Sequence, residues 1–130
     1  MSVIEGTRSL KTWKGSYDFA IDGGVVGTIP LRSDDGQMPV GSVVEGGYVD
    51  VITPLTGVGA SVAIQAEGAG DTIAAAAISG APWSTAGRKS VVPAFTGATT
   101  LKTTAARVPS VVVSAAALTA GKLDVVLFYR

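Results

Sequence analysis

Cysteine and histidine are both missing from the 130 residues of this chain. Without cysteine there are no disulfide bonds and no thiolate chemistry, and without histidine the commonest general base and metal ligand is gone. Charged residues are sparse, at 15% of the chain, and the ten basic side chains balance the ten acidic ones. Bulk charge therefore gives no reason to expect a nucleic-acid partner.

Long hydrophobic runs are missing as well. The longest unbroken aliphatic run, Ile73 to Ile78, is far too short to cross a bilayer. The first fifteen residues, MSVIEGTRSLKTWKG, contain no apolar segment of signal-peptide length. We therefore expect no membrane partner and a protein that is made without secretion.

Motifs that carry catalysis are not found either. The glycines of GGVVGTIP, residues 23–30, lack the lysine of a phosphate-binding loop and the helix that a dinucleotide-binding loop requires. No Gly-x-Ser-x-Gly motif marks a nucleophilic serine. The sequence therefore predicts a protein that is not an enzyme and that uses no cofactor.

Paired carboxylates occur only at Asp34 and Asp35, before Gly36. An EF-hand calcium loop needs further oxygen ligands at spaced positions and a closing glutamate, so we interpret these residues as a turn. No metal site is predicted here. A metal site assembled from distant carboxylates, such as those of Asp18, Asp50 and Asp71, is the remaining enzymatic alternative.

Short β-strands separated by glycine and proline dominate what the chain does contain. Alternation is clearest at Ser61 to Glu67 and Lys122 to Tyr129, and the second segment is apolar enough on both faces to be central or to lie at a subunit contact. Similar runs are expected at 17–21, 25–29, 43–53, 91–95, 99–104 and 108–114. The alanine-rich run 72–79 could be a short helix or a strand, and its length favours a strand. This pattern predicts an all-β fold, an antiparallel β-sandwich (jelly-roll-like) or a barrel, as a single domain over residues 16–130.

Two turn predictions follow from glycine. Asp22-Gly23-Gly24 favours a hairpin between the strands on either side, because Asp-Gly suits a type I′ turn. Gly46-Gly47 suggests a bulge in the strand that begins at Val43, and Pro54 and Gly57 are expected to end that strand.

Residues 1–15 are predicted to form an extended N-terminal arm. Trp13 lies there among Arg8, Lys11 and Lys14. One interpretation is a solvated segment whose tryptophan packs onto its own domain. The other is an arm that contacts a neighbouring subunit or a capsid with these four residues, since interfaces are enriched in Trp and Arg.

Three segments carry a resemblance to a known group of proteins. They are YDFAIDGGVVGTIPL, GGYVDVITPLTGVGASVAIQAEGAGD and ALTAGKLDVVLFY, which together extend from Tyr17 to Tyr129. The chain resembles small virion structural proteins of tailed bacteriophages, of the capsid decoration or head-fibre-like kind. The resemblance implies a homo-oligomer, usually a trimer, that is made in the host cytoplasm and binds the major capsid protein on the capsid exterior. It implies no catalytic residues.

A carbohydrate- or receptor-binding module, such as a fibre tip, is the alternative function. In that case Trp83, in a loop before Arg88 and Lys89, would stack on a sugar. The competing interpretation is that Trp83 covers one end of the sandwich.

Overall fold

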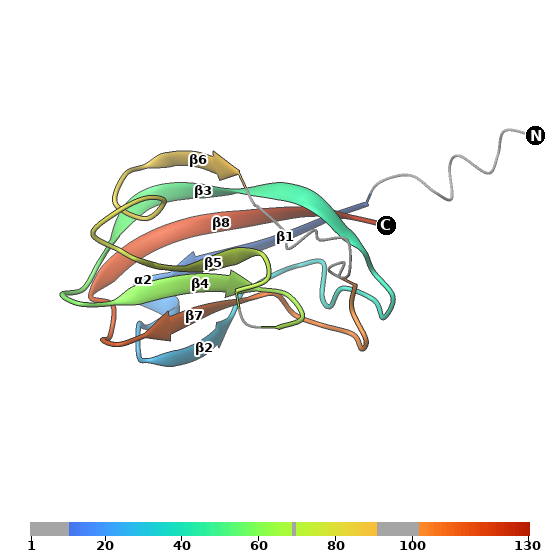
Figure 1. Ribbon diagram of the computed structural model, residues 1–130, viewed down its shortest axis with the longest axis horizontal. Coiled ribbons are helices and arrows are strands. Elements are labelled where there is room, and N and C mark those ends of the chain that lie inside the picture. Colours follow the sequence, from blue (N-terminus) through green and yellow to red (C-terminus); the bar gives the residue numbers. More distant parts are fainter. Residues whose placement is uncertain (1–10, 69, 91–101) are drawn as a thin grey trace, which may run out of the picture.

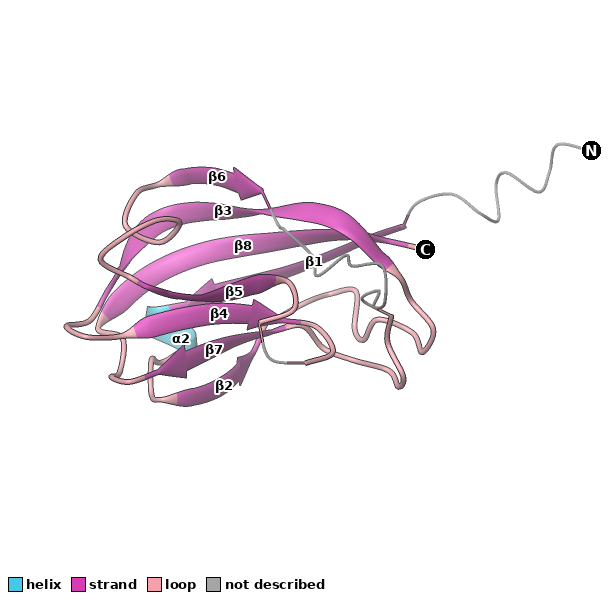
Figure 2. Ribbon diagram, in the orientation of Figure 1, coloured by secondary structure: helices cyan, strands magenta, loops and turns pink. Residues whose placement is uncertain are grey.

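The computed structural model describes residues 11–68, 70–90 and 102–130, and these residues form two antiparallel β-sheets packed face to face (Figure 1). Eight strands and one short helix are present in the described residues, and strand dominates (Figure 2). The elements are β1 (Lys11–Asp18), α2 (Phe19–Asp22), β2 (Gly27–Pro30), β3 (Val44–Thr56), β4 (Ser61–Gln65), β5 (Ile73–Ala77), β6 (Gly87–Ser90), β7 (Ser110–Ser114) and β8 (Ala120–Tyr129). The predicted all-β sandwich is confirmed.

The strand order identifies the sandwich as a jelly roll. One sheet has the order β1-β8-β3-β6 and the other β2-β7-β4-β5. The first strand pairs with the last, the second with the seventh, the third with the sixth and the fourth with the fifth, which is the pairing of a jelly roll. Because both sheets end in edge strands, the barrel alternative is wrong.

The first sheet is built around β8 and the long strand β3. β8 lies between β1 and β3, as its two apolar faces predict. The pairing of β3 with β8 shifts register between Val44 and Gly46, at the predicted bulge. Pro54 does not end the strand, contrary to expectation: a further register shift between Thr53 and Thr56 accommodates the residue that cannot donate a hydrogen bond.

The second sheet is shorter and its strands carry small side chains. β4 alternates as predicted, with Val62 and Ile64 buried in the core. The alanine-rich segment forms the strand β5 and not a helix. Of the remaining expected strands, 91–95 lies outside the described residues and 99–104 lies partly outside them.

The predicted hairpin at Gly23-Gly24 is wrong. Residues Phe19–Asp22 form a helical turn after β1, and the chain then crosses to the other sheet to begin β2. Gly23 does adopt the positive φ that was expected, at 75°, but it caps this turn. β1 pairs instead with β8, and β2 with β7.

The core lies between the two sheets and includes both tryptophans. Trp13 and Trp83 are fully buried, as are Tyr17, Met38 and a layer of valines and leucines from both sheets. No buried side-chain nitrogen or oxygen among the described residues lacks a hydrogen-bond partner. None of the helical structure in this part of the chain is long and apolar enough to span a membrane.

Candidate interaction surface

Acidic side chains do not gather into a metal site in the structure. No group of three or more potential ligands occurs among residues 11–68, 70–90 and 102–130. Asp35 accepts a hydrogen bond from the backbone N–H of Lys14 at 2.9 Å, and Gly36 has a φ of 70°. The Asp34-Asp35 segment is therefore a turn that holds the edge of β1.

Asp71 has a similar structural role. Its carboxylate accepts hydrogen bonds from the backbone N–H groups of Ala66, Glu67 and Gly68, at 2.7–2.9 Å. These bonds close the connection between β4 and β5. The carboxylates of Asp35 and Asp71 thus both stabilise turns.

Glu67 is held by an arginine and a threonine. Arg107 donates to it from Nε at 2.7 Å and from a terminal guanidinium nitrogen at 3.1 Å, and Thr104 donates from its hydroxyl and backbone N–H. The Arg107 and Thr104 hydrogen bonds lower the pKa of Glu67 from 4.5 to about 2. A carboxylate held in this way stays ionised, so it is a poor general acid or base near neutral pH.

Of the four predicted contact residues, Arg8, Lys11, Trp13 and Lys14, the three that the structure describes differ in their exposure. Lys11 to Gly15 belong to β1, so the predicted arm and the sandwich overlap by five residues. Trp13 is fully buried, and its indole Nε1 donates to the carbonyl oxygen of Gly36 at 2.9 Å. Lys11 and Lys14 are exposed, and Arg8 lies outside the described residues. Trp13 therefore packs onto its own domain, and in this structure its side chain is not accessible to a partner.

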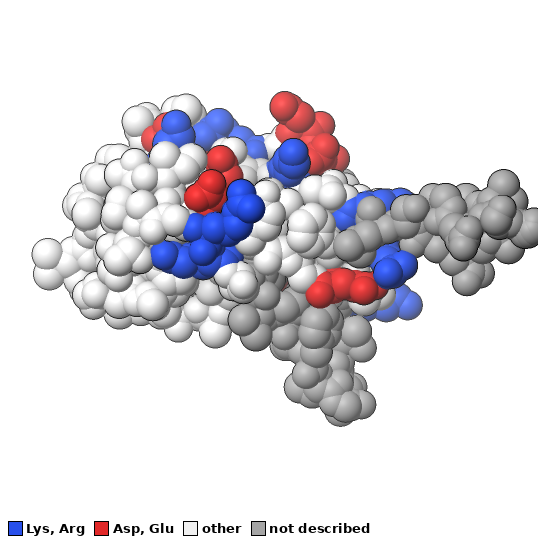
Figure 3. Space-filling model, turned by 90° about the horizontal axis from the view of Figure 1, so that it is seen from above, with Lys and Arg blue, Asp and Glu red and all other residues white. Residues whose placement is uncertain are grey.

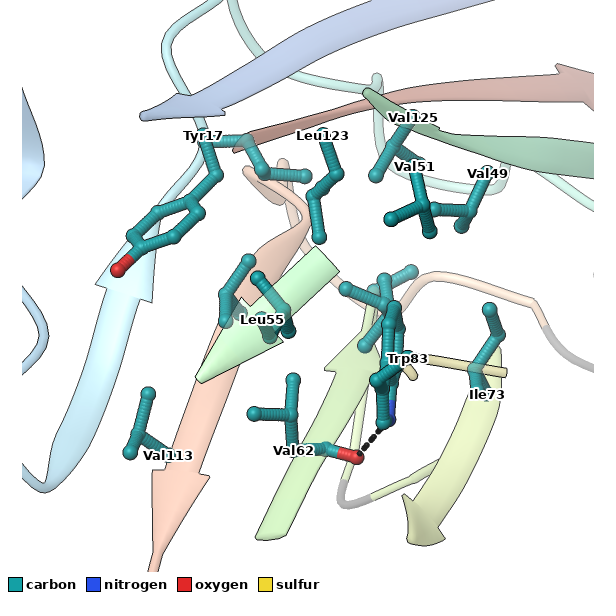
Figure 4. Packing of buried hydrophobic residues seen from close by; sticks show 14 of the residues in the cluster. Tyr17, Val49, Val51, Leu55, Val62, Ile73, Trp83, Val113, Leu123 and Val125 are labelled. Carbon is teal, nitrogen blue, oxygen red and sulfur yellow. Dashed lines mark hydrogen bonds between the residues drawn. The ribbon is translucent and has the colours of Figure 1, made fainter. Parts of the chain in front are cut away.

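Trp83 is also fully buried, between β4 and the end of β3 (Figure 4). Its indole Nε1 donates to the carbonyl oxygen of Val62 at 3.0 Å, and its own carbonyl oxygen accepts from the backbone N–H of Leu55. Trp83 thus covers the end of the core from inside. It offers no face on which a sugar could stack, so the carbohydrate-binding alternative loses its platform.

Charge is distributed very unevenly over the sandwich. Segments 23–31, 51–66, 72–87 and 108–121 contain no acidic or basic residue. They include every strand of the sheet β2-β7-β4-β5. Charged side chains are found on the other sheet, such as Asp50, Arg88 and Asp124, and beside the end of β1, where Asp18 lies opposite Lys122 and Asp22 pairs with Arg32. In the view of Figure 3, one end of the molecule is free of charge.

Four connections form this end, which we call the uncharged end. They are the loop 23–26, the turn 57–60, the loop 78–86 and the turn 115–119, all on the left of Figure 1. Backbone hydrogen bonds join them: Leu118 N–H to Gly24 O, Thr119 N–H to Thr56 O, and Ile78 N–H to Ala60 O. Because these bonds connect neighbouring loops, the uncharged end is one continuous surface.

The uncharged end exposes large aliphatic side chains. Val58 is 100% exposed, Val25 71% and Val26 57%, and Ile21 in the adjoining α2 is 66% exposed. Beside Val58 lies a hollow of about 420 Å³, lined mainly by apolar atoms of residues 55–60 and 77–79. Apolar patches of this kind usually mark interaction sites. This surface is the strongest candidate for function in the described residues.

Sequence reasoning missed this surface although its signal is present in the sequence. The four charge-free segments can be found by inspection, but each is separated from the next by charged residues. Only the jelly-roll topology brings their loops to the same end of the molecule. The valines themselves resemble ordinary strand residues when only periodicity is considered.

No family model matches this chain, and no curated protein matches it. Its fold occurs in two phage capsid structures. A chain of the cyanophage Pam1 capsid asymmetric unit is similar with a TM-score of 0.64 and 17% identity, over 93% of this chain and 84% of that one. A chain of the acidic stable capsid structure of Helicobacter pylori bacteriophage KHP30 is similar with a TM-score of 0.59 and 14% identity, over 92% and 86%. At these identities the similarity establishes the fold.

Proposed function

We propose that this protein is a non-enzymatic structural component of a bacteriophage virion. The observation that carries the proposal is a jelly roll shared, over nearly the whole chain, with chains of two phage capsids. The described residues agree with it: their strongest acidic contacts are structural, and their most distinctive surface is apolar. A surface of that kind suits protein contacts better than chemistry.

In the finer form of this proposal, the protein decorates the capsid exterior as a homotrimer bound to the major capsid protein. The segment that begins the chain, with Arg8, and the exposed Lys11 and Lys14 supply shell contacts. The protein is synthesised in the host cytoplasm before it joins the virion. The two lysines support this because both are exposed, close to where the chain enters β1. Trp13 supports it only indirectly, by fixing β1 in the core.

Purified virions of the phage that encodes this chain provide the test. Quantitative mass spectrometry should find the protein in a fixed ratio to the major capsid protein, and antibodies should label intact capsids. In a second arm, recombinant protein should bind capsids that lack it. If washed virions contain none of the protein, the structural role is wrong. If the protein is found only in tails, the capsid location is wrong.

A further inference from the structure

We propose that the uncharged end is the surface through which copies of this chain contact one another. The contact residues are Val25, Val26 and Val58, together with the hollow beside Val58. The inference rests on the proposed function in one respect, because it takes the protein to act as an oligomer. It assigns a specific surface and a specific partner, a second copy of the same chain.

Exposure and continuity make this surface unusual. Single exposed aliphatic side chains are normal on a soluble protein and need no explanation. Here three large ones are more than half exposed within the four connections, where hydrogen bonds between loops hold the backbone in place. A fixed apolar surface can be covered without the ordering cost that a mobile loop would pay.

Charge complementarity selects a second copy as the partner. A charge buried at an interface without a counter-charge is strongly unfavourable. A surface that contains no charge therefore fits best against another that contains none, and the same end of a second copy meets that condition. The sheet β2-β7-β4-β5 is also free of charge, but its strands expose none of the large aliphatic side chains that the end exposes. The outer face of the sheet β1-β8-β3-β6 does not, because it presents both signs, at Asp50, Arg88, Lys122 and Asp124.

The position of the surface agrees with this choice. The start of β1 and the C-terminal end of β8 lie at the opposite end of the sandwich from the uncharged end (Figure 1). A ten-residue strand such as β8 extends about 33 Å between the two ends. Contacts of Lys11 and Lys14 with a shell and contacts of the uncharged end with sister subunits therefore do not compete for space.

The size of the surface is close to that of a small interface. A standard protein interface involves roughly 20–30 residues and about 800 Å² from each partner. The four connections contain 22 residues, and 17 of them are accessible because Gly24, Ala60, Ile78, Trp83 and Leu118 are buried. An area of standard size is a modest part of the 6629 Å² that this chain exposes.

Sedimentation of the recombinant protein without capsids tests the inference. The variants are Val58→Asp, Val25→Asp and the two combined. Each places a charge on a highly exposed side chain, so the circular dichroism spectrum should not change. The matched control is Val40→Asp, because Val40 is 65% exposed in the loop between β2 and β3, away from the uncharged end.

We expect the wild-type protein and Val40→Asp to sediment as an oligomer at micromolar concentration. The double variant should sediment as a folded monomer of 13.0 kDa, with each single variant weakening association at least tenfold. A double variant that associates like the wild type overturns the inference, as does a wild-type monomer or equal dissociation by Val40→Asp. A monomer that still binds capsids contradicts this inference alone. An oligomer formed through this end that binds no capsid contradicts the proposed function alone.

Discussion

The buried tryptophan of β1 shows how one residue decides between two interpretations of the N-terminal segment. If Trp13 were buried only by a partner, its loss would not change the stability of the isolated domain. The structure instead buries the indole completely and satisfies its N–H with Gly36. Its neighbour Thr12 is exposed on the same strand, so the pair offers a direct comparison.

Replacement of Trp13 by alanine should lower the free energy of unfolding by about 3–5 kcal/mol, because it leaves a large cavity and an unpaired carbonyl. Thr12→Ala should change it by no more than about 0.5 kcal/mol. Chemical denaturation of the isolated protein measures both values. Equal, small effects would restore the interpretation in which a partner buries Trp13.

Glu67 provides a pH-dependent test at the same scale. Its pKa falls from 4.5 in the unfolded chain to about 2 in the folded protein, chiefly because of the Arg107 hydrogen bonds. The stabilisation is therefore complete above pH 4.5 and is lost as the pH falls toward 2. In Glu67→Gln and Arg107→Gln, the decline in unfolding free energy over this interval should be shallower than in the wild type. Denaturation curves at several pH values check this, and parallel declines would contradict it.

Gly24 illustrates a glycine required by close approach. A Cβ added there would lie 2.7 Å from both the Cβ and the carbonyl oxygen of Leu118, whereas one added to Gly80 meets nothing within 4 Å. Gly24→Ala should therefore destabilise the fold by about 1–3 kcal/mol and Gly80→Ala by much less. Thermal unfolding compares them. Equal melting temperatures would show that the Gly24 loop moves aside freely.

At the scale of elements, local patterns predicted strands better than their partners. β4 and β8 were recognisable because their side chains alternate, and the Gly46-Gly47 bulge because two glycines interrupt a strand. The hairpin at Gly23-Gly24 failed because an Asp-Gly turn is a local preference, while β1 finds its partner β8 at the far end of the chain. Pro54 stayed within β3 because a register shift absorbed it, and no local pattern reports such a shift.

The candidate site could likewise be predicted only where it depended on local or compositional features of the sequence. The expectation of a non-enzymatic protein came from composition and motifs, so it needed no knowledge of the fold. The burial of Trp13 and Trp83 was not predictable, because a tryptophan beside cations is compatible with a core and with an interface. The uncharged end could not be predicted, because only the fold determines which loops lie side by side.

At the scale of the whole molecule, the two proposed contacts differ in their response to salt. Attachment of Lys11 and Lys14 to a shell is electrostatic and should weaken as sodium chloride rises from about 0.1 M to about 1 M, where the screening length falls to about 3 Å. Association through the uncharged end should persist or strengthen, because no charge pair contributes to it. Sedimentation and capsid binding over the same salt series measure the two effects. Dissociation of the oligomer by salt would show that charged residues hold it together.

The pairing of the first strand with the last also governs when this protein can fold. Lys11 lies opposite Tyr129, and β3 likewise depends on β8 for its longest pairing. Residues 120–129 must therefore leave the ribosome before the first sheet can close. Until then, the apolar segments of β1 and β3 remain without their pairing partner. Folds with such distant contacts form slowly. Truncation from the C-terminal side should accordingly be far more damaging during synthesis than the loss of an equal length from an edge strand.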